Sequence, residues 1–189
     1  MKLIVGLGNP GKEYINTRHN MGFRMIDYYL DSLHINANWS KKFNGYYFQT
    51  VINQEKVLFV KPLTFMNLSG DCVRKFVDYY DINIDDLLVI SDDLDLNIGN
   101  FKLKSSGSCG GHNGLRDIEL KLNTSEYKRL KIGVSNDKSI DTKDYVLGNI
   151  SKEDNKSLEE VFSVLVDVLN DYFIMGFGDL MSKYNRKNK

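Results

Sequence analysis

The chain has 189 residues, of which 42% are hydrophobic and 26% are charged, proportions typical of one globular domain with a sizeable core. Basic and acidic side chains number 25 each, which excludes a generally basic surface as an argument for nucleic-acid binding. No apolar run approaches the length of a membrane span, and the first residues lead into a strand without a signal-peptide pattern. Cys72 and Cys109 have no disulfide or metal-site spacing, so we expect a protein of the reducing cytoplasm.

A short apolar run at residues 3–5 predicts a buried strand, which glycine and proline residues at 6–11 then end. Asn9 and His19 belong to the polar stretch that follows this strand. Because open α/β sheets bind ligands at the carboxyl ends of their strands, we expect a site at this point. Residues 22–35 carry apolar side chains at helical spacing and predict an amphipathic helix.

The next segment predicts a hairpin and a helix. Residues 46–52 and 56–61 are rich in aromatic and β-branched side chains, and the three polar residues between them indicate a β-hairpin. A helix is predicted near residues 69–80, with Asn67 or Ser69 as its cap.

Three more elements follow in the second half of the chain. The apolar run at 87–90 is typical of a buried strand and brings Asp92 to its carboxyl end. Residues 101–103 alternate apolar side chains with lysine, which predicts a strand with one wet face. A Gly/Ser-rich loop then leads to a predicted helix at 113–122 and a strand at 130–134.

A long helix is predicted near the C-terminus. Ser151 and Asp154 resemble a capping box, and the apolar side chains that follow are aligned as far as Tyr172. Glycine residues end this helix, and we expect a short turn that contains Leu180. The basic tail 183–189 is expected to be frayed.

Strands that alternate with helices, together with one hairpin, predict an α/β fold: a three-layer sandwich in which helices flank a twisted mixed sheet. No repeat or linker divides the chain, so we expect a single domain over residues 1–189. If the strands at 3–5 and 87–90 are neighbours in this sheet, their carboxyl ends bring Asp92 close to His19.

His19 lies in a polar loop with no apolar face for it to pack against. A bond from Asp92 to one imidazole nitrogen would fix the tautomer and leave the other nitrogen as a base. A solvated acidic turn is the alternative interpretation of Asp92. Together with His112, these residues have the composition of a two-histidine, one-carboxylate metal site. No histidine spacing typical of such a site supports it, so we expect no metal.

Gly6, Gly8 and Gly11 satisfy the G-x-G-x-x-G pattern of dinucleotide-binding proteins. Pro10 has no backbone N–H to offer a phosphate, and residues 11–20 have no apolar stripe to form the helix that should follow. The acid expected about 20 residues later falls inside a predicted helix. A nucleotide-cofactor enzyme is therefore the alternative function, but we expect the protein to bind no cofactor.

Three amides and a group of basic residues are further candidates. Asn9, Asn67 and Asn113 each lie beside Gly, Pro or Ser, so each is either a turn-former or cap or a neutral partner for amide and ester oxygens. The segment 102–131 holds seven basic residues against three acids. It is either a solvated face or a surface for a polyanion. No G-x-S-x-G sequence is present, so a serine nucleophile is not expected.

Four segments resemble, in order, the motifs of the bacterial peptidyl-tRNA hydrolase family: residues 6–20, 64–70, 92–96 and 110–115. The resemblance spans residues 3 to about 150. It implies an α/β domain and a metal-independent hydrolase that cleaves the ester between a peptide and the 3′-terminal ribose of tRNA. An ester has a good leaving group, so water and a general base suffice, and no covalent nucleophile is required.

The resemblance also implies roles for individual residues. His19 matches the general base, Asp92 the carboxylate that supports it, and Asn113 the residue that positions the water or binds the oxyanion. Asn9 and Asn67 match residues that bind the main chain of the peptide.

Four further residues match positions toward the tRNA: Tyr14 and Phe65 near its bound end, and Lys104 and Lys131 at its 5′ phosphate. Lys131 stands where the family more often has arginine, so a bidentate phosphate contact is lost there. Peptidyl-tRNA is the expected partner of a cytoplasmic monomer. A non-catalytic RNA-binding relative is an alternative, but it would be expected to lack His19 or Asp92.

Overall fold

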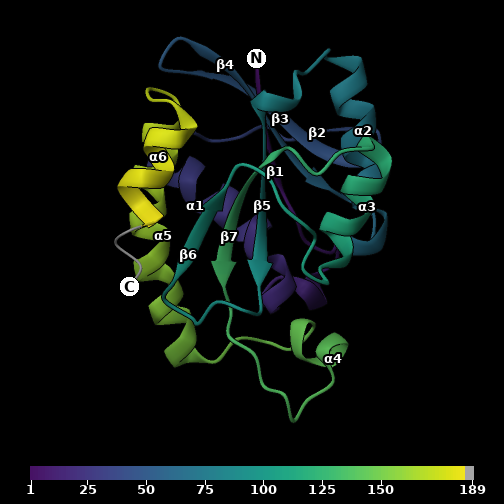
Figure 1. Ribbon diagram of the computed structural model, residues 1–189, viewed down its shortest axis with the longest axis vertical. Coiled ribbons are helices and arrows are strands. Elements are labelled where there is room, and N and C mark those ends of the chain that lie inside the picture. The colour runs from purple at the N-terminus through teal and green to yellow at the C-terminus, as the bar shows by residue number, and fades with distance from the viewer. Residues whose placement is uncertain (186–189) are drawn as a thin grey trace.

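The fold is a mixed β-sheet with helices on both faces, seen in a computed structural model that describes residues 1–185 (Figure 1). The strands of the described residues are β1 Lys2–Gly6, β2 Ser40–Lys42, β3 Gly45–Ile52, β4 Glu55–Pro62, β5 Leu87–Asp93, β6 Phe101–Lys104 and β7 Lys128–Gly133. They form one sheet in the order β2-β3-β4-β1-β5-β7-β6. The four central strands, β4, β1, β5 and β7, are parallel, and the pairs toward both edges are antiparallel. The predicted mixed sheet and the hairpin of β3 and β4 are confirmed.

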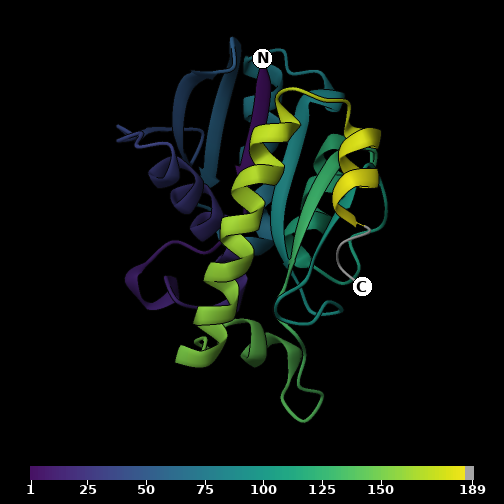
Figure 2. The ribbon, with the colours of Figure 1, turned by 90° about the vertical axis from the view of Figure 1, so that its left-hand side faces the viewer.

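Helices cover both faces of this sheet, as Figures 1 and 2 show. Their bounds are α1 Met21–Ser32, α2 Ser69–Tyr79, α3 Asn113–Leu122, α4 Thr142–Val146, α5 Lys152–Tyr172 and α6 Phe177–Tyr184. α1, α5 and α6 cover one face, whereas α2 and α3 cover the other, which confirms the three-layer α/β arrangement. In the described part of the chain, no helix combines the length and apolar character needed to cross a membrane.

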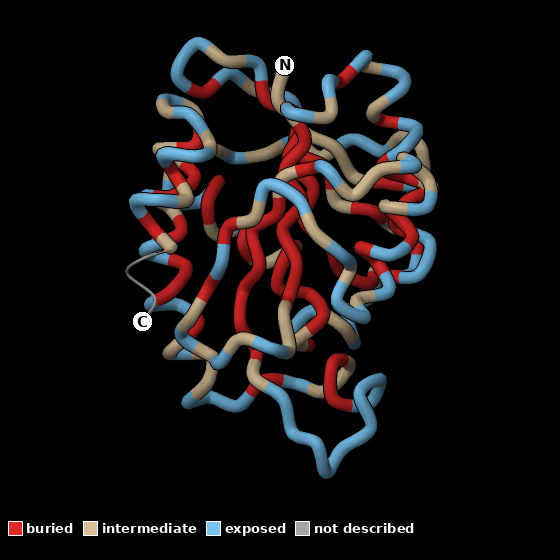
Figure 3. Tube along the Cα trace, viewed as in Figure 1, coloured by how far each residue is buried: buried red, intermediate tan, exposed pale blue. Residues whose placement is uncertain are grey.

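Alternate residues of the central strands divide between two cores. Leu3 and Val5 of β1 belong to the core beneath α2 and α3, whereas Ile4 belongs to the core beneath α1, α5 and α6. All three side chains are fully buried, and Figure 3 shows the same burial along the middle of the sheet. Burial on both faces explains why this strand has a continuous apolar run instead of an alternating pattern.

The first turn of α1 packs directly onto the ends of β1 and β5, which are parallel neighbours as expected. A Cβ at Gly22 would lie 2.2 Å from the backbone nitrogen of Leu7 and 2.4 Å from the carbonyl oxygen of Ile90. Only glycine permits this approach. The short 3₁₀ turn η2, Arg18–Asn20, which immediately precedes α1, is therefore held at the carboxyl edge of the sheet.

Some local expectations were wrong. β2 and α4 were not predicted from the sequence. Ser69 is the first residue of α2 and does not cap it, because its hydroxyl donates instead to the carbonyl oxygen of Met66 at 2.8 Å. The cap of α5 is confirmed, since the Ser151 hydroxyl accepts a hydrogen bond from the backbone N–H of Asp154 at 3.1 Å.

The C-terminal segment forms the helix α6 where a short turn was expected. Leu180 is fully buried and Tyr184 is 5% exposed, so this helix contributes to the core. The hydroxyl of Tyr184 donates to Asp171 at 2.6 Å, and Lys183 pairs with the same carboxylate. The expectation of a frayed tail is thus wrong for Lys183 and Tyr184, and residues 186–189 lie outside the described part of the chain.

Candidate active site

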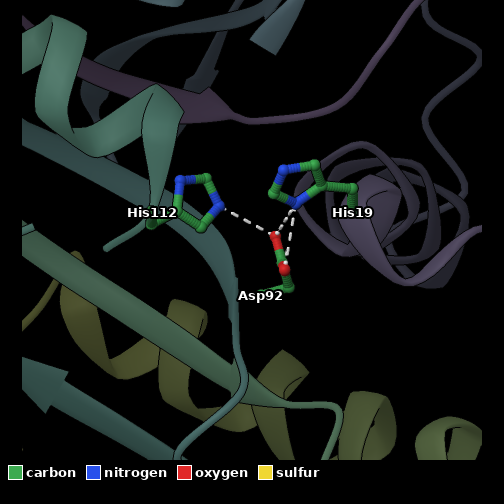
Figure 4. Close-up of side chains that lie close together, drawn as sticks. All are labelled: His19, Asp92 and His112. Carbon is green, nitrogen blue, oxygen red and sulfur yellow. Dashed lines mark hydrogen bonds and ion pairs between the residues drawn. The ribbon is translucent and has the colours of Figure 1, made fainter. Parts of the chain in front are cut away.

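His19 and Asp92 face each other at the carboxyl edge of the sheet (Figure 4). His19 lies in η2 between β1 and α1, and Asp92 is the penultimate residue of β5. The Nδ1 atom of His19 lies 2.9 Å from Oδ1 and 3.0 Å from Oδ2 of Asp92. The proximity predicted from neighbouring parallel strands is confirmed. Because Nδ1 carries the proton that it donates to the carboxylate, Nε2 is left with a lone pair.

Burial and charge act in opposite directions on this pair. Asp92 is 3% exposed and His19 is 8% exposed. Burial by itself would raise the pKa of Asp92, but the two neighbouring histidines hold that pKa well below its usual range. Burial lowers the pKa of His19, and the charge and hydrogen bond of Asp92 outweigh it and raise that pKa above the ordinary value. The site therefore stabilises an imidazolium beside an ionised carboxylate.

His112 completes the group, and its tautomer follows from its hydrogen bonds. It precedes α3, and its Nδ1 accepts from the backbone N–H groups of Gly114 at 3.1 Å and Leu115 at 3.3 Å. The ring proton is therefore on Nε2, which donates to Oδ1 of Asp92 at 2.9 Å. From the sequence, His112 was a candidate only as a metal ligand. Its position directly before a predicted helix was the signal that it caps that helix.

Among the described residues, His19, Asp92 and His112 are close enough to hold a metal ion, with candidate ligand atoms within 4.8 Å of one another. Both ring nitrogens that face Asp92 already donate a proton to it. A metal ion would have to displace both protons and both hydrogen bonds. The arrangement is thus complete as a hydrogen-bonded histidine–aspartate–histidine group.

Asn9 is locked beside this group by its own backbone and side chain. Its backbone N–H donates to the side-chain oxygen of Asn20 at 2.8 Å, and the Asn20 amide donates back to the Asn9 carbonyl at 3.0 Å. The side-chain oxygen of Asn9 accepts from the backbone N–H of Met66 at 2.8 Å. These bonds orient the amide so that its NH₂ group is available to a ligand.

An open cleft of about 960 Å³ joins the site residues predicted from the sequence. Its lining includes Asn9, Tyr14, His19, Phe65, Asn67, Asp92, Asn113 and Lys131. Phe65 is 58% exposed, although it is a large apolar side chain. Asn113 is the first residue of α3 and is exposed, with its side-chain oxygen 3.3 Å from a guanidinium nitrogen of Arg116. Tertiary structure therefore brings five separate sequence segments to one cleft.

The helix α4 forms one wall of this cleft, below the carboxyl ends of β5 and β7 in Figure 1. Arg18, the residue before His19, donates from its guanidinium to the carbonyl oxygen of Tyr145 at 3.1 Å. The same guanidinium lies 4.0 Å from the centre of the Tyr145 ring. These contacts tie the wall to the turn that carries His19.

The two predicted phosphate-binding lysines are placed differently. Lys131 lines the cleft, and its Nζ lies 3.7 Å from a carboxylate oxygen of Asp93. In the β6–β7 register, Lys131 is opposite Lys102, and Lys104 is opposite Arg129. Residues directly opposite each other share a face of the sheet. Lys102 is therefore the nearest cross-strand cation to Lys131, which the sequence alone did not reveal.

The glycine fingerprint does not form a dinucleotide site. After Gly11 the chain forms the 3₁₀ turn η1, Lys12–Tyr14, and then η2, and α1 begins only at Met21. A phosphate bound by the glycine-rich turn would therefore not meet the start of a helix, which is the basis of that fingerprint.

The fold and the site define a class: an α/β protein with a histidine–aspartate pair in an open cleft, as general-base hydrolases have. Comparisons with known proteins specify it further. The family model for peptidyl-tRNA hydrolase matches residues 3–189, and the chain belongs to this family. The peptidyl-tRNA hydrolase of Bacillus subtilis is 45% identical over 188 residues, which cover 99% of this chain and 100% of the relative. That of Listeria monocytogenes is 43% identical with the same coverage.

Solved structures agree with this assignment. The crystal structure of peptidyl-tRNA hydrolase from Acinetobacter baumannii has a TM-score of 0.85 and 33% identity, and the match covers 98% of this chain and 94% of that one. A structure of a peptidyl-tRNA hydrolase in complex with n-propanol has a TM-score of 0.90 and 32% identity, with the same coverage. The predicted family and fold are confirmed.

Proposed function

We propose that this protein hydrolyses peptidyl-tRNA at the ester between the peptide and the 3′-terminal ribose. The observation that carries the proposal is the 2.9 Å contact of His19 Nδ1 with buried Asp92, in a cleft lined by neutral amides. This contact gives His19 a base nitrogen, Nε2, and a buried counter-charge for the imidazolium. Membership of the peptidyl-tRNA hydrolase family supports the choice of substrate.

His19 acts first as a base. Its Nε2 removes a proton from water while the water oxygen attacks the ester carbonyl, and Asp92 stabilises the imidazolium that forms. Asn113 lines the same cleft, and its amide orients the water or donates to the oxyanion. The bond between the carbonyl carbon and the ribose oxygen then breaks. The imidazolium returns its proton to that oxygen, which yields a tRNA hydroxyl and a peptide carboxylic acid. The acid then ionises to the carboxylate and releases the second proton of the water to solvent.

Neutral side chains hold the peptide. Asn9 offers its NH₂ group after its oxygen is engaged by Met66, and Asn67 lies exposed on the same cleft. We assign both to the peptide main chain. Tyr14 and Phe65 also line the cleft, and their rings suit contact with the terminal nucleotide of the tRNA.

The cations of β6 and β7 face the tRNA. Lys131 and Lys104 are assigned to its 5′ phosphate, and the register adds Lys102 directly opposite Lys131. Like charges placed opposite each other in a sheet are unfavourable without a counter-ion. The Asp93 carboxylate, 3.7 Å from Lys131 Nζ, offsets part of this positive charge, and a phosphate would offset the rest.

The reaction needs no metal ion, because water, a base and a good leaving group are sufficient. We propose that the protein works as a monomer in the cytoplasm, where its substrate arises. The absence of a disulfide spacing for Cys72 and Cys109 supports that compartment.

The direct test is release of N-acetyl-aminoacyl groups from tRNA, with and without a chelator. We expect release at the same rate in both, and its loss in His19→Ala. A non-catalytic RNA-binding protein would bind the tRNA but leave the ester intact, which would contradict the proposal. Inhibition by the chelator that added metal reverses would contradict the metal-free mechanism.

A further inference from the structure

A second cavity, of about 370 Å³, adjoins the catalytic cleft. Asn9 lines both spaces, so the two meet at this residue. We call this space the side cavity. Its walls come from the turn after β1, the first two turns of α1 and the ends of β3 and β4. A chain that contacts Asn9 in the catalytic cleft can continue into the side cavity without leaving the protein surface.

The side cavity carries a positive charge. Lys12, Arg24 and Lys61 line it, against one acid, Asp27. Asp27 pairs with Lys61, and Arg24 donates to the neutral side chain of Asn155 at 2.9 Å. Lys12 is exposed. Glu159, which lies outside the lining, acts on Arg24 through its negative charge. Lys12 is therefore the cation of the lining that no acid balances, and an unbalanced cation favours an anionic ligand.

Apolar side chains form the rest of the lining. Phe23, Tyr46 and Leu63 are half-buried, and Ile15 is 54% exposed. Binding sites usually combine an apolar lining with a few charged or polar groups that select the ligand. The side cavity has this composition.

The order of the sheet gives the direction in which a substrate crosses the site. The side cavity lies on the side of β4, which supplies Lys61, and the proposed phosphate contact Lys131 lies on β7. His19 follows β1 and Asp92 ends β5, the two strands between β4 and β7. The two parts of an ester extend in opposite directions from its carbonyl carbon. If the tRNA lies toward β7, the peptide therefore extends past Asn9 toward β4.

We infer that the side cavity binds the peptide residues upstream of the esterified residue, with a preference for acidic side chains. This inference rests on the proposed function. A peptide of a single residue would end near Asn9, whereas a longer one spans about 3.3 Å for each added residue and reaches the side cavity. Peptide length and charge should then affect recognition, independently of the chemistry at His19.

The test compares tRNAs that carry an N-acetyl-amino acid or an N-blocked peptide of six residues, with either glutamate or lysine upstream. The measured quantity is kcat/KM for the six-residue substrate divided by that for the one-residue substrate. We expect this ratio to be about three to ten times higher with glutamate than with lysine, the range for exposed ion pairs. Lys12→Glu should reverse the preference. Lys56→Glu, an exposed lysine outside both cavities, is the matched control and should keep it.

Other outcomes would overturn the inference. Lys12 would serve no peptide subsite if Lys12→Glu left the ratio unchanged. The same would follow if this variant lowered kcat/KM equally for the one-residue and six-residue substrates. Tyr46→Ala is a second test. This variant removes an aromatic side chain from the lining, so it should lower the ratio for both the glutamate and the lysine peptide. If either variant instead weakens inhibition by a CCA trinucleotide, the side cavity binds RNA and the inference is wrong. If the wild type hydrolyses none of the substrates, the proposed function fails, and the inference fails with it.

Discussion

His112 donates from Nε2 to Oδ1 of Asp92, the same oxygen that His19 Nδ1 approaches at 2.9 Å. One buried carboxylate oxygen thus holds two imidazole rings, whose centres lie 4.8 Å apart. The proton of His112 is fixed on Nε2 by the backbone N–H groups that its Nδ1 accepts. His112 is therefore placed to position Asp92, and through Asp92 to adjust the basicity of His19.

The first prediction concerns His112→Ala. Asp92 would lose one of its two histidine donors, so its negative charge would act more strongly on His19. We expect the pKa of His19 to rise and turnover at neutral pH to fall by about tenfold, the lower end for losing a hydrogen bond to a charged group. NMR titration of His19 measures the shift. His112→Gln keeps a donor to Asp92, so its His19 pKa should lie between those of the wild type and His112→Ala. A His19 pKa that is unchanged in both variants would show that His112 only caps α3.

The second prediction is that His19→Ala removes turnover but keeps tRNA binding. His19 supplies the base, and loss of a general base costs at least about 10² to 10⁴ in rate. Single-turnover hydrolysis and a filter-binding Kd for peptidyl-tRNA separate the two effects. Turnover close to that of the wild type would disprove the assignment of His19.

The third prediction links pH to the pair. The pKa of His19 is raised above the ordinary 6.5, and the base must be unprotonated, so kcat should increase with pH through that raised value. Asp92→Asn removes the negative charge and lowers the pKa of His19, so the rise of kcat with pH should shift to lower pH. The same variant should lower kcat more than it changes KM. The stabilisation linked to His19 should be complete below pH 6.5 and lost as pH rises through the folded pKa. An identical pH–rate profile in Asp92→Asn would contradict the pairing.

The fourth prediction concerns the cations of β6 and β7. Lys131→Ala should raise KM on full-length peptidyl-tRNA by about three- to tenfold, reduce the salt dependence of binding by about one phosphate contact, and change kcat little. Lys102→Ala should have a larger effect than Lys104→Ala, because Lys102 is the residue opposite Lys131. A substrate without the 5′ phosphate is the control. Equal losses on both substrates would mean that these lysines support the fold.

The fifth prediction tests how the fold places His19. At Gly22 a Cβ would meet backbone atoms at 2.2 and 2.4 Å, so Gly22→Ala should lower the free energy of unfolding by about 1–3 kcal/mol, the usual cost of overpacking, and reduce activity by displacing η2. Gly178→Ala in α6 is the matched control, because an added Cβ there meets no atom within 4 Å. That control should be neutral or slightly stabilising. Denaturant unfolding curves compare the two variants with the wild type. Equal free energies of unfolding would show that α1 accommodates the added Cβ at Gly22 without loss of stability.

The sequence by itself determined the parts of this protein that depend on local pattern. The apolar runs predicted β1 and β5, because strands buried on both faces cannot alternate. The place of Asp92 at the end of one such strand then predicted its proximity to His19. The glycine-rich and polar motifs identified the family, since each depends on residue type and spacing within a short segment.

Only the tertiary structure decided the features that depend on how distant segments meet. The role of His112 required the distance from the start of α3 to β5. The position of Lys102 opposite Lys131 required the register of β6 on β7. The helix α6 forms because the core buries Leu180, a contact that no local pattern encodes. The side cavity exists because α1, β3 and β4 close around the turn after β1. Each is a relation between residues far apart in sequence, which propensity and periodicity do not contain.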